Sequence, residues 1–103
     1  MFTQKEASRD EIVLSVQGPL SGEATAEFHT RMEELAAGRH LTITLDFSQT
    51  PSINSSALGK ILLFRQKLAE GGRTLQIVGC SEPLFKTFQM IKFDKLVTIR
   101  KER

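Results

Sequence analysis

Apolar residues along this chain switch repeatedly between a spacing of two and a spacing of three or four. Residues Glu11–Gln17 alternate apolar and polar side chains and end at Gly18-Pro19, which predicts a strand. Residues 22–37 carry apolar side chains at helical spacing, with Ser21 as the predicted N-cap and Gly38 as the stop. Because helices that connect neighbouring strands form right-handed crossovers, this alternation predicts an α/β fold with a largely parallel sheet.

The other predicted elements follow from the same two spacings. Residues 2–7 predict an antiparallel edge strand, because the polar residues 8–10 have the length of a hairpin turn. The further strands are predicted over residues 41–47, 73–78 and 96–99, and the further helices over residues 54–70 and from Ser81 onward. With 103 residues and 40% apolar content, the chain is long enough to form one modest core. We therefore expect a single domain over residues 1–103, with a sheet of four or five strands, an antiparallel N-terminal edge and helices packed on it.

The centres of the predicted apolar stripes identify the expected core. Six residues lie there, namely Leu45, Leu58, Ile61, Leu62, Ile77 and Phe88. Leu41 is expected to begin the better-buried face of its strand. Leu63 and Phe64 fall at the rim of the stripe on the second helix, so they either contact the neighbouring helix or leave apolar area for a partner.

Charge and cysteine usage limit the classes of partner and the compartment. The formal net charge is only +2 and basic residues are scattered between acids, so the sequence predicts no concentrated field that would attract nucleic acid or an anionic membrane. The first residues lack the apolar core of a secretory signal, and no stretch approaches the roughly 18 apolar residues of a membrane span. The single cysteine, Cys80, forms no internal disulfide and suits a reducing cytosol. We expect a cytoplasmic protein with no nucleic-acid partner and no direct insertion into a membrane.

Groups for catalysis or metal binding do not converge in the sequence. The histidines, His29 and His40, have no Cys, His or paired acid at ligand spacing. No glycine-rich loop follows a strand in the pattern that cradles nucleotide phosphates. The sequence therefore predicts no catalytic residue, no metal and no cofactor, and the chain is not expected to be an enzyme.

One segment, residues 45–59, runs from a strand through a polar loop into a helix with hydrogen-bonding side chains at its start. Asn54 or Ser55 can accept hydrogen bonds from the free amides of the first helical turn, which is worth about 1 kcal/mol. This structural role alone explains the residue types. A serine at such a position is also well placed to carry phosphate, because the free amides and the helix dipole favour an anion there.

Residues 54–59, Asn-Ser-Ser-Ala-Leu-Gly, resemble the Asp-Ser-Ser/Thr-Gly-Leu-Gly signature of the STAS family of anti-sigma-factor antagonists. Residues 18–21 resemble the Gly-x-Leu-Asp that precedes the first helix of that family. Residues 71–75 are similar to its glycine turn and fourth strand, and residues 93–96 to its C-terminal segment. The resemblance covers nearly the whole chain and implies the STAS fold.

The resemblance also implies a phosphorylatable switch protein. Members of the family bind an anti-sigma factor that is also a serine-protein kinase and so regulate transcription, and a phosphatase reverses the modification. By position the modified serine is Ser55, with the neighbouring Ser56 as the alternative. The family's two acids near this serine are replaced here by Ser21 and Asn54, and Ala57 replaces a glycine. The implied partner-binding surface consists of Ser21, Ser52, Asn54, Ser55, Ser56 and Leu58.

The same resemblance leaves a second function open. STAS domains also serve as non-phosphorylated accessory subunits, such as the cytoplasmic subunit that stabilises the ATPase of a phospholipid-transport ABC system. The loss of negative charge at residues 21 and 54 is compatible with this alternative.

Overall fold

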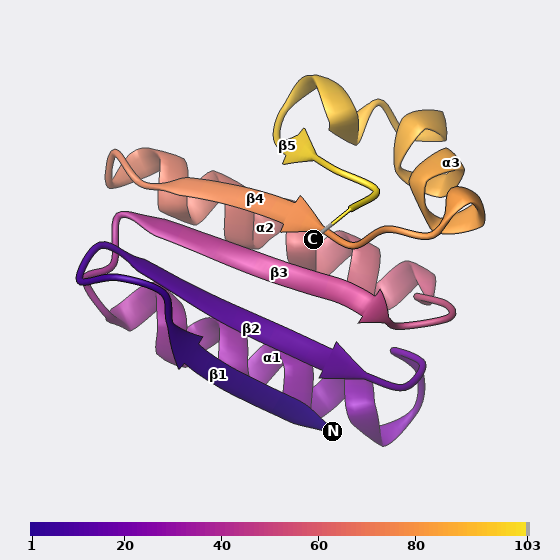
Figure 1. Cartoon of the computed structure of the whole chain (residues 1–103), viewed down its shortest axis with the longest axis horizontal. Coiled ribbons are helices and arrows are strands. Elements are labelled where there is room, and N and C mark those ends of the chain that lie inside the picture. The colour runs from indigo at the N-terminus through magenta and orange to yellow at the C-terminus, as the bar shows by residue number, and fades with distance from the viewer. Residues whose placement is uncertain (103) are drawn as a thin grey trace.

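The computed structural model describes residues 1–102. The elements alternate largely as predicted, with a short 3-10 helix, η1, added near the C-terminus (Figure 1). In chain order they are β1 (Phe2–Glu6), β2 (Glu11–Gln17), α1 (Glu23–Ala37), β3 (Thr42–Gln49), α2 (Ser55–Glu70), β4 (Thr74–Val78), α3 (Glu82–Met90), η1 (Phe93–Lys95) and β5 (Thr98–Ile99).

The strands form one five-stranded sheet in the order β1-β2-β3-β4-β5. β1 pairs antiparallel with β2, and each later strand pairs parallel with its predecessor. α1 and α2 lie side by side on one face of this sheet, and α3 with η1 lies beyond β4 (Figure 1). This topology confirms the predicted α/β architecture, a mostly parallel sheet with an antiparallel N-terminal edge.

A chain of phenylalanine rings runs through the core between the sheet and the helices. Successive ring centroids lie 6.2, 6.4, 6.3 and 5.7 Å apart, which is contact distance for aromatic pairs. The rings belong to Phe2, Phe28, Phe47, Phe88 and Phe93. The core is therefore continuous from the β1 edge of the sheet to η1.

The buried face of α2 differs from the predicted one. Leu45, Ile61, Ile77 and Phe88 are fully buried as expected, and Leu58 is partly buried against the core. The prediction that Leu62 lies in the core is wrong, because 43% of its surface is exposed to solvent. The residues of α2 that do face the core are Ala57, Ile61, Phe64 and Leu68. Residues 61–64 are all apolar, so their spacing does not determine how α2 is rotated about its axis. Packing against α1 and the sheet turns Phe64, and not Leu62, toward the core.

Two other details of the predicted elements are corrected. Leu41 is 54% exposed, because it precedes β3 and lies outside the pleated, half-buried part of the strand. Ser21 is not the N-cap of α1. Gly22 occupies that position with a φ of 58°, and no side chain caps the helix there. By contrast, Ser81 caps α3 as predicted, since its hydroxyl accepts a hydrogen bond of 3.3 Å from the amide of Leu84.

Arg73 holds the carboxyl end of α1 against the start of β4. Its Nη2 donates to the carbonyl of Leu35 at 2.9 Å and its Nη1 to that of Ala36 at 2.8 Å. Its Nε donates to the carbonyl of His40 at 2.7 Å. Carbonyls in the last turn of a helix lack the usual amide partner four residues on. The guanidinium supplies a donor to Ala36 and a second donor to Leu35, whose carbonyl also accepts from the amide of Gly38 at 3.1 Å.

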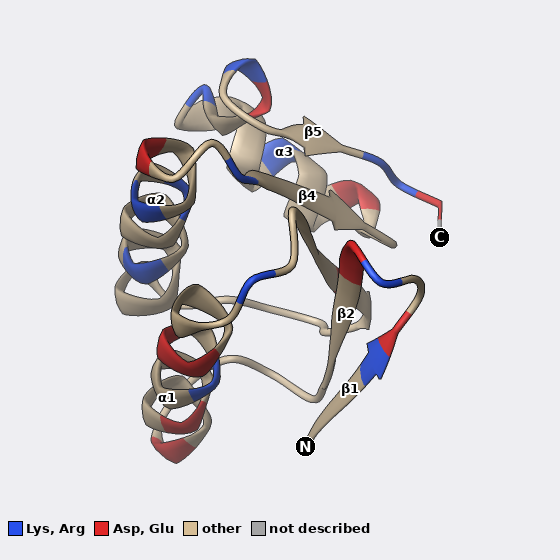
Figure 2. Ribbon diagram, turned by 90° about the vertical axis from the view of Figure 1, so that its left-hand side faces the viewer, with Lys and Arg blue, Asp and Glu red and all other residues tan. Residues whose placement is uncertain are grey.

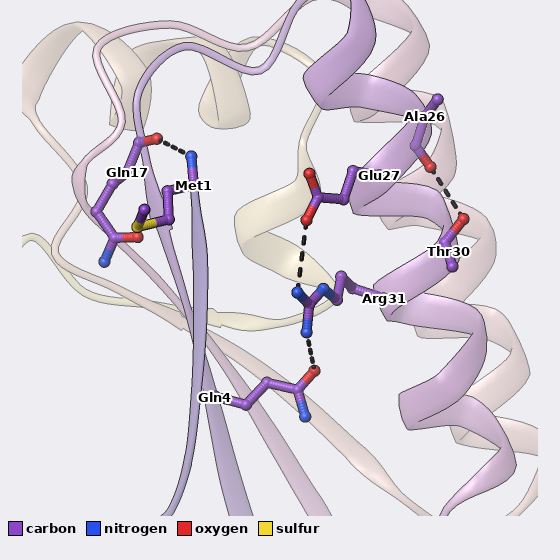
Figure 3. A network of polar contacts seen from close by, with 7 residues as sticks. All are labelled: Met1, Gln4, Gln17, Ala26, Glu27, Thr30 and Arg31. Carbon is purple, nitrogen blue, oxygen red and sulfur yellow. Dashed lines mark hydrogen bonds and ion pairs between the residues drawn. The ribbon is translucent and has the colours of Figure 1, made fainter.

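The edge strand β1 is fastened to α1 by exposed polar contacts (Figure 3). Arg31 bridges the two elements, since its Nη1 donates to Gln4 Oε1 at 3.3 Å and its Nη2 contacts Glu27 Oε2 at 3.4 Å. Exposed pairs of this kind contribute between about 0.2 and 1 kcal/mol each. Packing of Phe2 against Phe28, with ring centroids 6.2 Å apart, is therefore the stronger link between β1 and α1.

Gly79 allows β4 to turn closely past the end of β3. Its φ is +75°, in the left-handed region that favours glycine. A Cβ at this position would lie 2.8 Å from the amide nitrogen of Ser48 and 2.9 Å from Oδ1 of Asp46. The same Oδ1 accepts a hydrogen bond of 2.9 Å from that amide. The contact fixes where the loop after β3 departs from the sheet.

Candidate functional site

The loops that follow β2 and β3 run side by side at the carboxyl ends of these strands. The amide of Leu20 donates to the carbonyl of Ser52 at 2.9 Å, and the amide of Asn54 donates to the carbonyl of Leu20 at 3.0 Å. Leu20 and Ile53 form a parallel bridge, so the β2–β3 pairing resumes beyond the sheet. The carboxyl ends of parallel strands are where α/β sheets place their sites.

Thr50 fixes the loop after β3 to the end of β2. Its side chain is buried, and its Oγ1 donates to the carbonyl of Val16 at 2.7 Å. Its amide donates to the carbonyl of Phe47 at 3.0 Å. A buried hydroxyl bonded in this way fixes the loop, because breaking the bond leaves a desolvated polar group without a partner.

Asn54 is the N-cap of α2, as one of the two predicted candidates. Its Oδ1 accepts a hydrogen bond of 2.8 Å from the amide of Ala57, and its Nδ2 donates to Oγ1 of Thr25 at 3.2 Å. The first of these bonds satisfies a free amide of the helix. The second joins the start of α2 to the first turn of α1, so one side chain sets both the cap and the approach of the two helices.

Ser55 and Ser56 are the first two residues of α2, and both are exposed. Asn54 accepts hydrogen bonds from the amides of the two residues after the serines: its side chain accepts from Ala57, and its backbone carbonyl accepts from Leu58. The amides of the two serines precede these and point out of the helix end, where the dipole favours an anion. Each hydroxyl can thus carry a negative group without disturbing the cap.

The six residues of the predicted surface come from the two paired loops and the first turn of α2. Ser21 follows Leu20 directly and is exposed, as are Ser52, Ser55 and Ser56. Asn54 is partly buried by its hydrogen bonds, and Leu58 by its packing against the core.

The exposed surface continues from Ser55 along α2, where Leu63 was predicted at the rim of the apolar stripe and Leu62 was wrongly assigned to the core. Gly59, Leu62 and Leu63 follow Ser55 at intervals of four, seven and eight residues, so they share its side of the helix. Leu62 is 43% and Leu63 67% exposed, and nothing lies within 4 Å of a Cβ built on Gly59. We call these four residues the outer face of α2. Four successive apolar residues at 61–64 were the available signal, because one buried stripe cannot hold all of them.

The surface around Ser55 carries no charge of its own. Residues 48–59 include no Asp, Glu, Lys or Arg, and the first turn of α2 has no acid. A phosphate on either serine would therefore be the dominant local charge, since it adds about 1.5 to 2 negative charges at neutral pH.

The two main hollows of the described chain lie away from the serines, although Leu63 of the outer face of α2 lines one of them. One, of about 380 Å³, runs between α1 and α2 and includes Leu63 and Phe64. A larger one, of about 630 Å³, lies at the β5 edge between Arg65 and Lys95. Neither includes Ser55 or Ser56. Ser55 and Ser56 therefore lie on a part of the surface outside both hollows.

Residues 1–102 give little support for metal binding, a reactive thiol or a membrane-spanning helix. No group of three His, Cys, Asp or Glu lies close enough together to hold a metal ion within this range. Burial raises the pKa of the Cys80 thiol to about 12, so it stays protonated at neutral pH and is a poor nucleophile. None of the helices in this range has both the length and the apolar character needed to cross a bilayer.

Comparisons with known proteins bear on the fold and on the family. Residues 3–98 match a family model described as "Mlab, STAS domain". The search of curated proteins finds no match to the sequence. Among solved structures, an anti-sigma factor antagonist from Mycobacterium paratuberculosis is 16% identical with a TM-score of 0.84, over 97% of this chain and 86% of that chain.

Two further solved structures share the fold. The Bacillus cell fate determinant SpoIIAA in its phosphorylated form is 19% identical with a TM-score of 0.77, over 96% of this chain and 90% of that chain. A sulfate transporter family protein from Wolinella succinogenes is 13% identical with a TM-score of 0.78, over 95% of this chain and 82% of that chain. The fold is thus common to regulatory proteins and to parts of transporters.

Proposed function

The chain belongs to the STAS domain family, and we propose that it acts in the cytoplasm as an anti-sigma-factor antagonist whose partner binding is switched by phosphorylation of Ser55. Its partner is an anti-sigma factor with serine-kinase activity, and a phosphatase resets the switch. The protein itself supplies the acceptor hydroxyl and the docking surface and catalyses no reaction. The observation that carries the proposal is the exposed hydroxyl of Ser55 on the capped, uncharged amino end of α2.

The proposed modification follows ordinary phosphoryl transfer. The Oγ of Ser55 forms a bond to the γ-phosphorus of ATP held by the partner, and the bond from that phosphorus to the β–γ bridging oxygen breaks. The hydroxyl proton passes to a base of the partner kinase, and ADP leaves. The role of this chain is to present the hydroxyl on a rigid helix start, and the Asn54 cap keeps that start in place.

The switch works through charge at the interface. In the unmodified protein, a partner docks on a neutral surface that extends from Ser21 and Ser52 to the outer face of α2. The exposed leucines of that face supply the apolar contact that interface centres need. A phosphate on Ser55 places a bulky dianion in an interface that was fitted to a hydroxyl, and the complex weakens.

Titration of the partner kinase against variants by calorimetry tests the docking surface. Leu62→Ser and Ser55→Asp should each weaken the complex about tenfold or more, because loss of an apolar anchor or burial of a charge near the centre of an interface costs about 1.4 kcal/mol or more. Ser55→Ala should bind as the unmodified protein does. The matched control is Leu41→Ser, which removes a leucine of similar exposure away from this surface. Equal affinities for Leu62→Ser and Leu41→Ser would contradict the proposed surface.

A second candidate is a non-phosphorylated subunit that binds the ATPase of a transporter such as a phospholipid-transport ABC system. Two observations favour it: residues 21 and 54 carry no carboxylate, and the fold is similar to that of a sulfate transporter family protein. In this case the same surface stays permanently neutral. The ATPase should then co-purify with the chain, and Ser55→Ala should change neither binding nor modification.

A further inference from the structure

The basic residues of the chain are concentrated toward its C-terminal end. Residues 86–103 hold six Lys and Arg against two acids, a net +4, and residues 1–85 hold eight against ten, a net −2. In space four of the twelve acids lie on α1, while α3 and η1, which carry Glu82 and Asp94, lie at the opposite end of the molecule (Figure 2). An overall charge of +2 hides this separation, because it averages over the whole chain.

The same end exposes large apolar side chains. Met90 is 82% exposed, Ile91 50% and Leu96 44%. Phe88 and Phe93 on either side of the turn are buried against one another, with ring centroids 5.7 Å apart, so they supply the inward contact of this segment. The three exposed residues are left to point outward from the end of α3 and the end of η1.

Three lysines surround these apolar side chains. Lys86, Lys92 and Lys95 are exposed, and none of them takes part in an ion pair among residues 1–102. Lys101 differs, because its ammonium pairs with Glu82. Lys92 also has a φ of 59°, in the left-handed region where a glycine commonly ends a helix. Lys92 therefore occupies a backbone conformation that favours glycine.

We propose that this corner of the fold contacts the surface of a bilayer that contains anionic phospholipids. We call it the basic corner, and it consists of Lys86, Met90, Ile91, Lys92, Lys95 and Leu96. The apolar side chains enter the interface between headgroups and acyl chains, and the lysines contact lipid phosphates. The contact is shallow and reversible, and it orients the acidic α1 away from the negatively charged surface.

The observations favour a membrane over a protein as the occupant. Exposed lysines beside exposed apolar side chains match the charge and layering of an anionic bilayer surface, with phosphates outside and hydrocarbon beneath. Lys86, Met90, Ile91 and Lys92 line neither of the two main hollows, whereas Lys95 and Leu96 lie at the rim of the larger one, so most of the corner is convex. The proposal goes beyond the switch function and uses neither Ser55 nor the outer face of α2.

Vesicle sedimentation tests the proposal with the full chain. Vesicles of phosphatidylcholine alone should bind weakly, and vesicles that also contain phosphatidylglycerol should bind more strongly, with the difference lost at high salt. The triple variant Lys86→Gln, Lys92→Gly, Lys95→Gln should lower the partition coefficient about 100-fold, since each lysine near such a surface contributes about fivefold. Lys92→Gly by itself should reduce binding while leaving the melting temperature unchanged or higher, because glycine suits the left-handed backbone.

Matched variants separate the basic corner from general charge. Lys5→Gln, Arg9→Gln, Arg39→Gln removes three exposed cations elsewhere and should bind vesicles nearly as the unmodified chain does. Met90→Ser with Ile91→Ser should weaken binding, whereas Leu41→Ser should not. Equal loss in both triple variants, or equal binding to the two kinds of vesicle, would overturn the proposal. Self-association that the basic-corner triple abolishes, without vesicle binding, would instead assign the corner to the acidic α1 of a second copy.

Discussion

Asn54 and Thr25 are joined by a 3.2 Å hydrogen bond that connects the first turn of α2 to the first turn of α1. The same asparagine caps α2 through Ala57, so the start of the helix that presents Ser55 is held from two sides. A serine on a fixed helix start can change its charge without moving the backbone. The proposed switch therefore needs no refolding, and the stability of this region can be tested separately from its function.

Asn54→Ala should lower the free energy of unfolding by about 1 to 2 kcal/mol, because it removes the cap and leaves the Thr25 hydroxyl without this partner. Asn54→Asp should preserve stability at neutral pH. Its carboxylate can still accept from Ala57, the Thr25 hydroxyl can reverse and donate, and the negative charge complements the helix dipole. Urea denaturation of the two variants measures the difference. Unchanged stability in Asn54→Ala would show that the cap is unimportant, and an equal loss in both variants would show that a carboxylate cannot replace it.

The rotation of α2 makes opposite predictions for two neighbouring residues. Ile61→Ala should cost about 2 to 5 kcal/mol, because Ile61 is fully buried and the variant leaves a cavity in the core. Leu62→Ala should cost less than about 1 kcal/mol, since 43% of Leu62 is already exposed. Denaturant midpoints of both variants decide the matter. A larger loss for Leu62→Ala would mean that the helix is rotated by one residue.

Two glycines should respond to alanine in opposite directions. Gly79→Ala should destabilise the protein by about 1 to 2 kcal/mol or more, because its φ is +75° and the new Cβ would meet Ser48 and Asp46. Gly59→Ala should stabilise it by about 0.5 to 1 kcal/mol, since Gly59 lies inside α2 with open space around it. Thermal melting of the pair provides the check. A destabilised Gly59→Ala would place an unseen neighbour beside α2.

Arg73 should matter for the shape of its guanidinium as well as for its charge. Arg73→Lys should lose about 2 kcal/mol, because one ammonium cannot donate to the carbonyls of Leu35, Ala36 and His40 together. Hydrogen exchange of the last turn of α1 should increase in the same variant. A lysine variant with full stability and unchanged exchange would contradict this role.

The spacing of apolar residues predicted the order of strands and helices, because each strand or helix buries one face and its apolar residues recur with the period of that element. The residue types at the helix start predicted Asn54 or Ser55 as the cap for a similarly local reason, and the structure selects Asn54. Spacing did not determine the rotation of α2, because four adjacent apolar residues satisfy either rotation and only contact with α1 and the sheet selects one. The three-carbonyl contact of Arg73 was also hidden, since it joins groups more than 30 residues apart.

The site was predictable to the extent that its residues are close in sequence. Residues 52–58 form one continuous segment, and the exposure of Ser55 and Ser56 follows from their place at the helix start. The resemblance implied that Ser21 belongs to the same surface, whereas the pairing of Leu20 with Ser52 and Asn54 that brings it there could not be read from spacing. Leu62 was wrongly assigned to the core because the rotation of α2 was wrong. Leu63, predicted at the rim with a partner contact as one of two roles, is exposed, and both residues extend the surface.

The central claim is that Ser55 accepts phosphate, and one measurement tests it most directly. The chain and its Ser55→Ala and Ser56→Ala variants are incubated with ATP and a serine kinase of the anti-sigma-factor class, and the modified residue is located by mass spectrometry. We predict one phosphate on Ser55, its loss in Ser55→Ala and its retention in Ser56→Ala. Unmodified protein, or phosphate that persists in Ser55→Ala, would contradict the claim.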